Sequence, residues 1–229
     1  MPAKNSVKIY VENGFYHIYN RGVNKRSIFK DQQDYSVLLS YLKTYLLPKD
    51  TQGLDQILAD THSSAKEKDV ALNLLQLNNF HNRILLLAYI LMPNHFHFLI
   101  QQTGKNDMDS FMQSCMTRYT RYFNQKYKRV GPLFQGKYKA VMVESDAQLL
   151  YLTRYIHRNS LFLPGADIFC QPSSYSVYLG KTKQAWVKPE FILSNFSISG
   201  YNSYESFVED DDETIEEQSI FTLPKISLD

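Results

Sequence analysis

The feature that most constrains the fold is an unbroken apolar run over residues 84–92, followed at once by Pro93-Asn94 and by the alternating segment HFHFLIQ over residues 95–101. The run is too short to span a bilayer and suits a buried strand. Pro-Asn is a turn signal, although it does not fix the turn type. The sequence therefore predicts two antiparallel strands that form a hairpin.

Two histidines lie two residues apart on the second of these strands. His95 and His97 should therefore point to one face, whereas Phe96 and Phe98 should point to the opposite, buried face. Two neighbouring imidazoles can bind one divalent ion. A closed zinc site would need more ligands, and the two cysteines of the chain lack the spacing for one. Chance alternation also gives this spacing, so the pattern alone leaves a metal site and a structural pair open.

The rest of the chain alternates between strand and helix patterns. Strands are expected over 14–20 and 137–143, and helices over 31–47, 108–127 and 147–159. Residues 49–78 are polar, and we interpret them as an inserted loop with one helix near residues 71–77. The order β-α-β-β-α-β-α indicates an α+β fold, in which helices pack on an antiparallel sheet.

Charge is distributed unevenly along the chain. Residues 205–229 hold nine acidic residues and one lysine, which leaves 24 Lys and Arg against 14 Asp and Glu in residues 1–204, a net charge of +10. A basic body suits a polyanionic partner. The acidic tail is either a flexible, solvated segment or a segment that folds over the basic surface and limits access to it, and the charge pattern leaves both open.

The cysteine count and the N-terminal sequence argue against a secreted, disulfide-stabilised protein. The two cysteines do not form a disulfide framework, and the N-terminus lacks the pattern of a signal peptide. We therefore expect a soluble, cytoplasmic protein.

A stretch of 34 residues, 110–143, contains no acidic side chain. Cations neutralise phosphates, and aromatic faces stack on exposed bases. The absence of acids therefore favours a nucleic-acid surface over an ordinary solvated helix face. The segment interleaves Arg118, Arg121, Lys126, Lys128, Arg129, Lys137 and Lys139 with Tyr119, Tyr122, Tyr127 and Tyr138.

The expected helix over residues 147–159 carries Tyr155 and Asn159 four residues apart, so they share a face. The amide oxygen of Asn159 could add a ligand to an ion held by two histidines. A tyrosine hydroxyl, with a pKa near ~10, is a weak nucleophile unless a metal polarises the phosphate that it attacks. Tyr119 and Tyr122 compete for that role, and the pattern does not choose among them. His157 is off this face and is expected at the surface or in contact with nucleic acid, not as a ligand.

Five motifs, in this order, resemble those of the single-tyrosine HUH transposases, in particular the REP-associated tyrosine transposase branch. The resemblance implies a ferredoxin-like or RRM-like HUH nuclease fold over residues 1–180, with 49–78 as an insertion and 181–229 as a C-terminal extension that ends in the acidic tail. The motifs cover roughly residues 10–180 and are His17-Ile-Tyr-Asn-Arg21-Gly22, Met92-Pro-Asn-His-Phe-His97, Tyr122-Phe-Asn124, Gly131-Pro-Leu-Phe-Gln135-Gly-Lys-Tyr-Lys139 and Tyr155-Ile-His-Arg-Asn159.

The resemblance also implies the site and its chemistry. His95, His97 and Asn159 would hold Mg²⁺ or Mn²⁺, and Tyr155, not Tyr119, would be the nucleophile. The substrate would be single-stranded DNA, often next to a hairpin. Attack would give a 5′-phosphotyrosine link and a free 3′-hydroxyl, and a second 3′-hydroxyl would reverse it without ATP.

The DNA contacts are expected on polar and basic residues of the body. The protein is expected to act as a monomer or homodimer in the cytoplasm, associated with the nucleoid. The expected DNA-binding residues are Asn20, Arg21, Lys25, Arg26, Arg118, Arg121, Lys128, Arg129, Lys137 and Lys139.

Two other functions stay open at this stage. The basic, aromatic segment would also suit a catalytically inactive, domesticated protein that binds single-stranded or hairpin DNA. The histidine pair would also suit a hydrolytic nuclease, in which water attacks and no protein–DNA adduct accumulates. The complete set of His95, His97, Tyr155 and Asn159 favours the transesterase.

Overall fold

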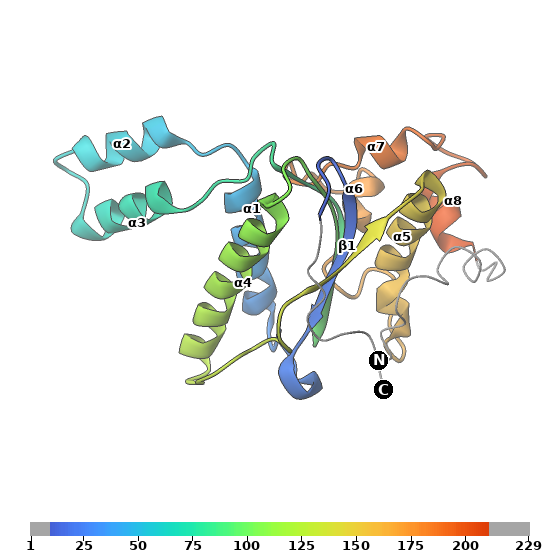
Figure 1. Ribbon diagram of the computed structural model, residues 1–229, viewed down its shortest axis with the longest axis horizontal. Helices are drawn as coiled ribbons and strands as arrows, with labels where there is room; N and C mark the ends of the chain where they lie inside the picture. The colour runs from blue at the N-terminus through green and yellow to red at the C-terminus, as the bar shows by residue number, and fades with distance from the viewer. Residues whose placement is uncertain (1–9, 211–229) are drawn as a thin grey trace.

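The computed structural model describes residues 10–210, and their centre is a four-stranded antiparallel sheet (Figure 1). The strands follow the order β2-β3-β1-β4. As expected, β2 and β3 form a hairpin around Pro93-Asn94. The α+β fold class is thereby confirmed. The strands are β1 (Phe15–Arg21), β2 (Ile84–Met92), β3 (His95–Gln102) and β4 (Lys139–Val143).

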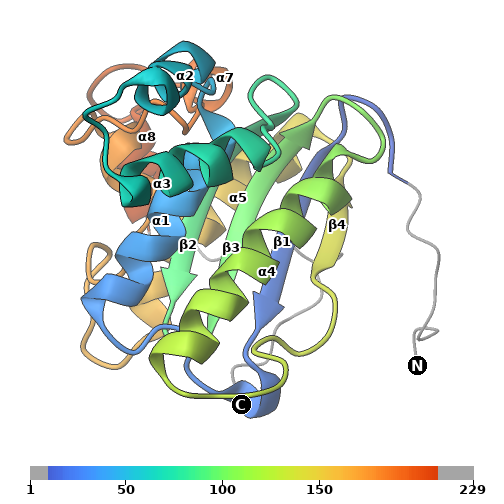
Figure 2. The same ribbon diagram turned by 90° about the vertical axis from the view of Figure 1, so that its left-hand side faces the viewer.

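Helices cover both faces of the sheet (Figure 2). Helices α1 (Gln32–Leu46) and α4 (Asp107–Lys126) lie on one face, and α5 (Asp146–Arg158) lies on the other. Directly paired residues of an antiparallel sheet share a face. His97 pairs with Tyr19 on β1 and with Ile90 on β2, so these residues share the face that α5 covers.

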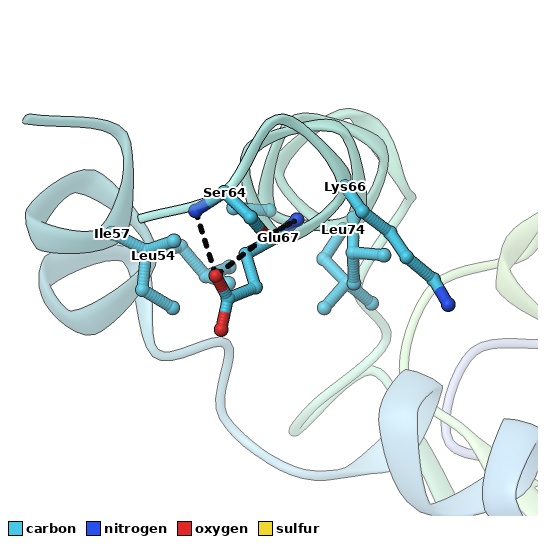
Figure 3. A pocket seen from close by; sticks show the side chains of 8 residues that line it. Leu54, Ile57, Ser64, Lys66, Glu67 and Leu74 are labelled. Atoms are coloured by element: carbon cyan, nitrogen blue, oxygen red, sulfur yellow. Dashed lines mark hydrogen bonds between the residues drawn. The ribbon is translucent and has the colours of Figure 1, made fainter. Parts of the chain in front are cut away.

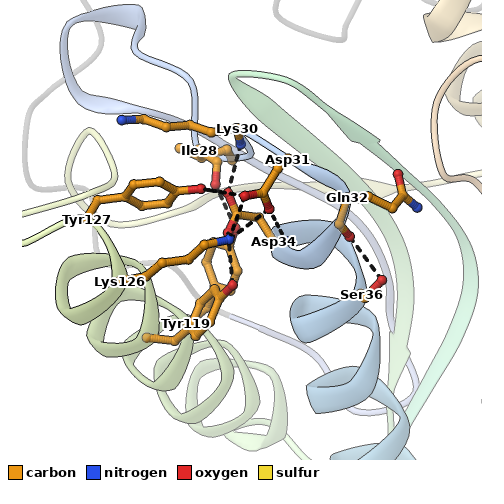
Figure 4. Close-up of polar contacts among 10 residues, drawn as sticks. Ile28, Lys30, Asp31, Gln32, Asp34, Ser36, Tyr119, Lys126 and Tyr127 are labelled. Atoms are coloured by element: carbon orange, nitrogen blue, oxygen red, sulfur yellow. Dashed lines mark hydrogen bonds and ion pairs between the residues drawn. The ribbon is translucent and has the colours of Figure 1, made fainter.

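A buried carboxylate joins α1 to α4 on the other face (Figure 4). Asp34 is fully buried and accepts hydrogen bonds from Lys126 Nζ (2.8 Å), Tyr127 Oη (2.7 Å) and the backbone N–H of Lys30 (2.8 Å). Burial alone would raise the pKa of this carboxyl, but the hydrogen bond from Lys126 and the other donors hold it below its usual value. The first turn of α1 is therefore fastened to the end of α4.

The insertion at 49–78 forms a helical hairpin that projects from the body (Figure 1). It contains α2 (Thr51–Ala59) and α3 (Ala65–Gln76), so the prediction of a loop with a single helix near 71–77 was wrong. Asp50 caps α2, and Ser64 and Glu67 form a capping box at the start of α3. Between the two helices lies a largely apolar hollow of about 480 Å³ (Figure 3).

The C-terminal extension, as far as Asp210, packs against α5. A 3-10 helix, η2 (Asn159–Phe162), follows α5, and a shorter one, η1 (Val23–Lys25), follows β1. Side chains of the extension such as Trp186, Ile192 and Tyr204 are buried. The remaining helices are α6 (Tyr175–Tyr178), α7 (Glu190–Leu193) and α8 (Tyr204–Glu209).

Direct hydrogen bonds tie the end of α8 to α5. Arg158 Nη1 donates to the backbone carbonyls of Val208 (2.8 Å) and Asp210 (2.9 Å). The hypothesis that the acidic tail covers a basic surface concerns residues 211–229, which lie outside the described part of the chain. Within residues 10–210, the helices are too short or too polar to cross a bilayer.

Candidate metal centre and nucleophile

Three buried histidines meet on the face of the sheet that α5 covers. His95 and His97 project from β3, as their spacing predicts, and His17 projects from β1. Their exposed fractions are 2%, 0% and 3% in that order. The ring centroids of His95 and His97 lie 5.0 Å apart, and His17 Nε2 lies 2.8 Å from His97 Nδ1. His17 belongs to one of the five sequence motifs, but the sequence predicts no role for it.

Helix α5 brings Tyr155 and the end of its last turn against these histidines. The Tyr155 ring lies 5.5 Å from that of His97 and 6.1 Å from that of His17, edge to face in both cases. Asn159 is buried, and its Oδ1 lies 3.3 Å from His95 Nε2. The spacing of four residues thus directs Tyr155 of α5 and Asn159, the residue that directly follows α5, to the same side of the helix, as predicted.

Burial keeps these histidines neutral at ordinary pH. Removal from water lowers the pKa of His17 to about 3 and that of His95 to about 4, and it lowers the pKa of His97 well below its usual value. Each ring therefore carries one N–H and one nitrogen lone pair. That is the state in which an imidazole can bind a metal ion.

His95 has an amide oxygen beside each of its ring nitrogens. Asn94 Oδ1 lies 2.7 Å from Nδ1, and Asn159 Oδ1 lies 3.3 Å from Nε2. A neutral ring has one N–H and can donate to only one of them. If it donates at the shorter contact, His95 Nε2 and Asn159 Oδ1 are two acceptors that a cation between them would satisfy. Adjacent ligands of an octahedral ion with bonds of about 2.1 Å are about 3 Å apart. The pair of atoms therefore fits two neighbouring ligands of one cation.

His97 offers a third atom that could bind a metal ion. Its Nε2 is buried and has no hydrogen-bond partner among the described residues. Buried polar atoms normally have a partner, so this nitrogen fits an atom that the protein itself does not supply. In the described part of the chain, no group of three His, Cys, Asp or Glu side chains is placed to hold a metal. A cation bound at His95 and His97 would need a further ligand of another type, and the amide of Asn159 lies beside His95.

The other candidate tyrosines lie across the sheet from the histidines. Tyr119 is fully buried, its hydroxyl donates to the carbonyl of Ile28 (2.6 Å), and burial raises its pKa far above its usual value (Figure 4). The Tyr122 hydroxyl donates to Asp34 Oδ1 (2.9 Å). Both belong to α4, so neither contacts the histidine cluster. Of the three tyrosines considered as nucleophile, Tyr155 is the one that contacts it.

His157 corrects an expectation. The sequence placed it at the surface, but it is fully buried between Tyr204 Oη and Ser174 Oγ, each 2.7 Å from one of its ring nitrogens. Ser174 accepts a hydrogen bond from the backbone N–H of Tyr89 (2.9 Å) on β2. His157 therefore connects α5 to the sheet and to α8, and its role is structural.

Two of the predicted DNA-binding cations flank the histidine cluster. Arg21 pairs with His95 across β1 and β3, and its guanidinium donates to Gln135 Oε1 (3.2 Å). Lys139 pairs with Tyr19, and its Nζ lies 5.6 Å from the centre of the Tyr19 ring. Both therefore extend from the same face as the histidines. They form a positively charged border to the site.

The other eight predicted DNA-binding residues are divided between the neighbourhood of the site and α4. Lys25 and Lys137 are exposed in the two loops that the Gly22–Phe134 bridge joins beside the site. Asn20 and Arg26 are engaged by their own surroundings: Asn20 Nδ2 donates to the carbonyl of Gly136 and Arg26 Nε to that of Val23. The remaining four belong to α4 and the loop after it, and they are Arg118, over the Tyr41 ring at 4.0 Å, Arg121, Lys128 and Arg129.

Comparison with known proteins agrees with this geometry. The model of the IS200-like transposase family matches residues 63–159, which include both β3 histidines, Tyr155 and Asn159. The chain is also similar to a solved REP-associated tyrosine transposase bound to a REP hairpin, with a TM-score of 0.52 and 12% identity over 81% of this chain and 98% of that one. A candidate transposase from Deinococcus radiodurans R1 matches with a TM-score of 0.28 and 18% identity over 66% of this chain and 95% of that one.

A search of curated proteins finds no match. The first of the two solved structures shows that this chain shares the fold of a REP-associated tyrosine transposase. Residues 63–159 of the chain match the IS200-like transposase family.

Proposed function

We propose that this protein cuts and rejoins single-stranded DNA by a metal-dependent transesterification with Tyr155 as the nucleophile. One observation carries the proposal: the Tyr155 ring lies 5.5 Å from the His97 ring, which lies 5.0 Å from the His95 ring, and Asn159 Oδ1 lies 3.3 Å from His95 Nε2. A tyrosine that only packs in the core would not need three neutral, buried donors beside it.

The reaction exchanges one ester of phosphate for another. The Tyr155 oxygen forms a bond to phosphorus, and the bond from phosphorus to the 3′ oxygen breaks. The tyrosine loses its proton, and the departing 3′ oxygen gains one. The products are a 5′-phosphotyrosine link and a free 3′-hydroxyl, and attack by another 3′-hydroxyl reverses the step and joins strands. No ATP is required, because the number of phosphoester bonds does not change.

We propose Mg²⁺ or Mn²⁺ as the ion, as the family resemblance implies. The amide oxygen of Asn159 and the phosphate oxygens of the DNA suit these ions, whereas the two imidazole nitrogens of His95 and His97 are ligands that transition metals prefer. A bound divalent ion would polarise the phosphate under attack and offset charge in the transition state. The protein supplies the rest: α5 and the sheet hold Tyr155 and the ligands together, and Arg21 and Lys139 attract the phosphate backbone.

We propose hairpin-flanked single-stranded DNA as the substrate. The similar solved transposase was bound to a REP hairpin. In this chain, the exposed Lys25 and Lys137 extend the positive border made by Arg21 and Lys139. Binding should therefore weaken steeply as the salt concentration rises.

The test is the capture of a covalent adduct. An oligonucleotide that carries a hairpin, a single-stranded flank and a fluorophore at its 3′ end is incubated with Mn²⁺ and resolved on a denaturing gel. Wild-type protein should retain the label, and Tyr155→Phe should not. Tyr151→Phe, one turn earlier on α5, is the matched control and should behave as wild type, because the Tyr151 ring packs on Phe207 and makes no ring contact with the histidines among the described residues.

Other outcomes would replace this proposal. Cleaved DNA without any adduct would indicate a hydrolytic nuclease. Salt-sensitive binding without cleavage, in the presence of either Mg²⁺ or Mn²⁺, would indicate a protein that only binds DNA.

A further inference from the structure

His17 contacts His97, one of the proposed ligands. Its Nε2 is 2.8 Å from His97 Nδ1, and both rings are buried. The ring centroids are 5.1 Å apart and the ring planes differ by only 16°. Because the two nitrogens are so much closer than the centroids, the rings meet edge to edge in nearly one plane. This is the geometry of an in-plane hydrogen bond, not of face-to-face stacking.

This hydrogen bond can hold only one proton, and its position decides what His97 can do. If the proton belongs to His17 Nε2, then His97 Nδ1 accepts it, and the N–H of His97 is at its Nε2. If the proton belongs to His97 Nδ1, then His17 Nε2 accepts it, and His97 Nε2 keeps a lone pair. Only the second arrangement lets His97 Nε2, which has no partner among the described residues, bind a cation. In that arrangement the N–H of His17 is at its Nδ1, which is likewise buried without a partner among the described residues.

We propose that His17 is a positioning residue of the metal site. It accepts a hydrogen bond from His97 Nδ1–H and so holds His97 in the tautomer and ring orientation that present the Nε2 lone pair to the ion. This inference rests on the proposed function, because it assumes that His97 is a ligand. Partners of this kind typically change metal affinity by about 10–100-fold when they are removed.

The register of β1 against β3 makes this arrangement possible. His17 pairs with Leu99 and Tyr19 pairs with His97, so His17 is the diagonal neighbour of His97 on the same face. Side chains on diagonal positions are within reach of each other when they are long or aromatic. The hydrogen-bond partner of His97 Nδ1 is thus His17 on β1, 80 residues away in the sequence.

Three variants separate the hydrogen bond from simple packing. His17→Gln keeps an acceptor oxygen for His97 Nδ1–H, whereas His17→Leu fills similar space without an acceptor. Tyr19→Phe is the packing control, because the Tyr19 ring lies 5.9 Å from that of His97 and makes no hydrogen bond to it among the described contacts. Circular dichroism verifies that each variant is folded.

Two measurements test the proposal, and neither uses DNA. Long-range ¹H–¹⁵N spectra of the metal-free protein report which nitrogen of His97 carries the proton. Wild type and His17→Gln should show the proton on Nδ1, and His17→Leu should show it on Nε2 or on both. Titration of free Mn²⁺ by electron paramagnetic resonance should show affinity about 10–100-fold weaker for His17→Leu and within about threefold of wild type for His17→Gln and Tyr19→Phe.

The outcomes distinguish this inference from the proposed function. His17→Leu with wild-type Mn²⁺ affinity, or wild-type His97 with its proton on Nε2, would overturn the role of His17 alone. A wild-type protein that binds no Mn²⁺ would overturn both proposals. A wild-type protein that shows the expected effect of His17 on Mn²⁺ but forms no DNA adduct would overturn only the transesterase.

Discussion

Replacing His157 with glutamine tests whether this histidine is held as a neutral ring inside the protein. Burial lowers the pKa of His157 to about 3, whereas a histidine in the unfolded chain titrates near ~6.5. Between these two values the unfolded chain binds a proton that the folded protein does not. The stability that neutral His157 contributes is therefore complete above pH 6.5 and is lost as the pH falls towards 3. From pH 7 to pH 5 this window spans roughly 1.5 pH units, at about 1.4 kcal/mol per unit, so the expected loss is about 2 kcal/mol.

Urea unfolding at pH 7 and at pH 5 measures this loss. Glutamine offers one donor and one acceptor to Tyr204 and Ser174 but does not titrate. The fall in unfolding free energy between the two pH values should thus be about 2 kcal/mol smaller in His157→Gln than in wild type, while the contributions of the other histidines cancel. If both proteins lose the same free energy, the account of His157 is wrong.

Three further predictions concern packing, the metal and the inserted hairpin. Ile156→Ala, at a fully buried position of α5, should lower the free energy of unfolding by about 2–5 kcal/mol, measured with urea. Leu161→Ala, at a side chain that is 41% exposed, should change it by under about 0.5 kcal/mol. Equal losses would contradict the assigned core. Because the proposed ligands carry no formal charge, Mn²⁺ should bind more tightly when DNA phosphate is present, and Asn159→Ala should weaken this binding in a calorimetric titration; unchanged affinity would remove Asn159 from the set. Replacing residues 50–77 by a short Gly-Ser linker should leave the melting temperature within a few degrees of wild type, because α2 and α3 bury little against the body: Ala71 is the one fully buried residue in the two helices. A collapse of the fold would show that the hairpin supports the body.

The elements that face the core could be predicted closely from the sequence. The run over Ile84–Met92 forms a strand with those bounds, because both of its faces are covered and every position favours burial. The hairpin α2–α3 was half missed although its apolar residues have helical spacing. Leu54 and Ile57 on α2 and Val70 and Leu74 on α3 line the hollow between the two helices. The Ser64-to-Glu67 capping box was a readable signal for the start of α3.

The site could be predicted only as far as local spacing reaches. The two-residue spacing of His95 and His97 and the four-residue spacing of Tyr155 and Asn159 each set a shared face, and the structure brings the two pairs together. The place of His17 depends on the register of β1 against β3, which no local pattern specifies.

The burial of His157 was beyond local reasoning for a similar reason. Residues that follow it by 17 and 47 positions cover it, and neither is recognisable as its partner from the sequence around α5. Likewise, Tyr119 and Tyr155 look alike as residues in amphipathic helices. The packing of their helices on opposite faces of the sheet separates them.

The most direct test of the central claim is to identify the tyrosine that becomes linked to DNA. After reaction with Mn²⁺ and hairpin-flanked DNA, the protein is digested with trypsin and nuclease, and the peptide that carries a nucleotide is sequenced by mass spectrometry. Cleavage after Arg154 and Arg158 releases residues 155–158 as a peptide of their own, separate from the peptide that contains Tyr151. The account predicts the nucleotide on Tyr155. A nucleotide on Tyr151, Tyr119 or any other residue would contradict it.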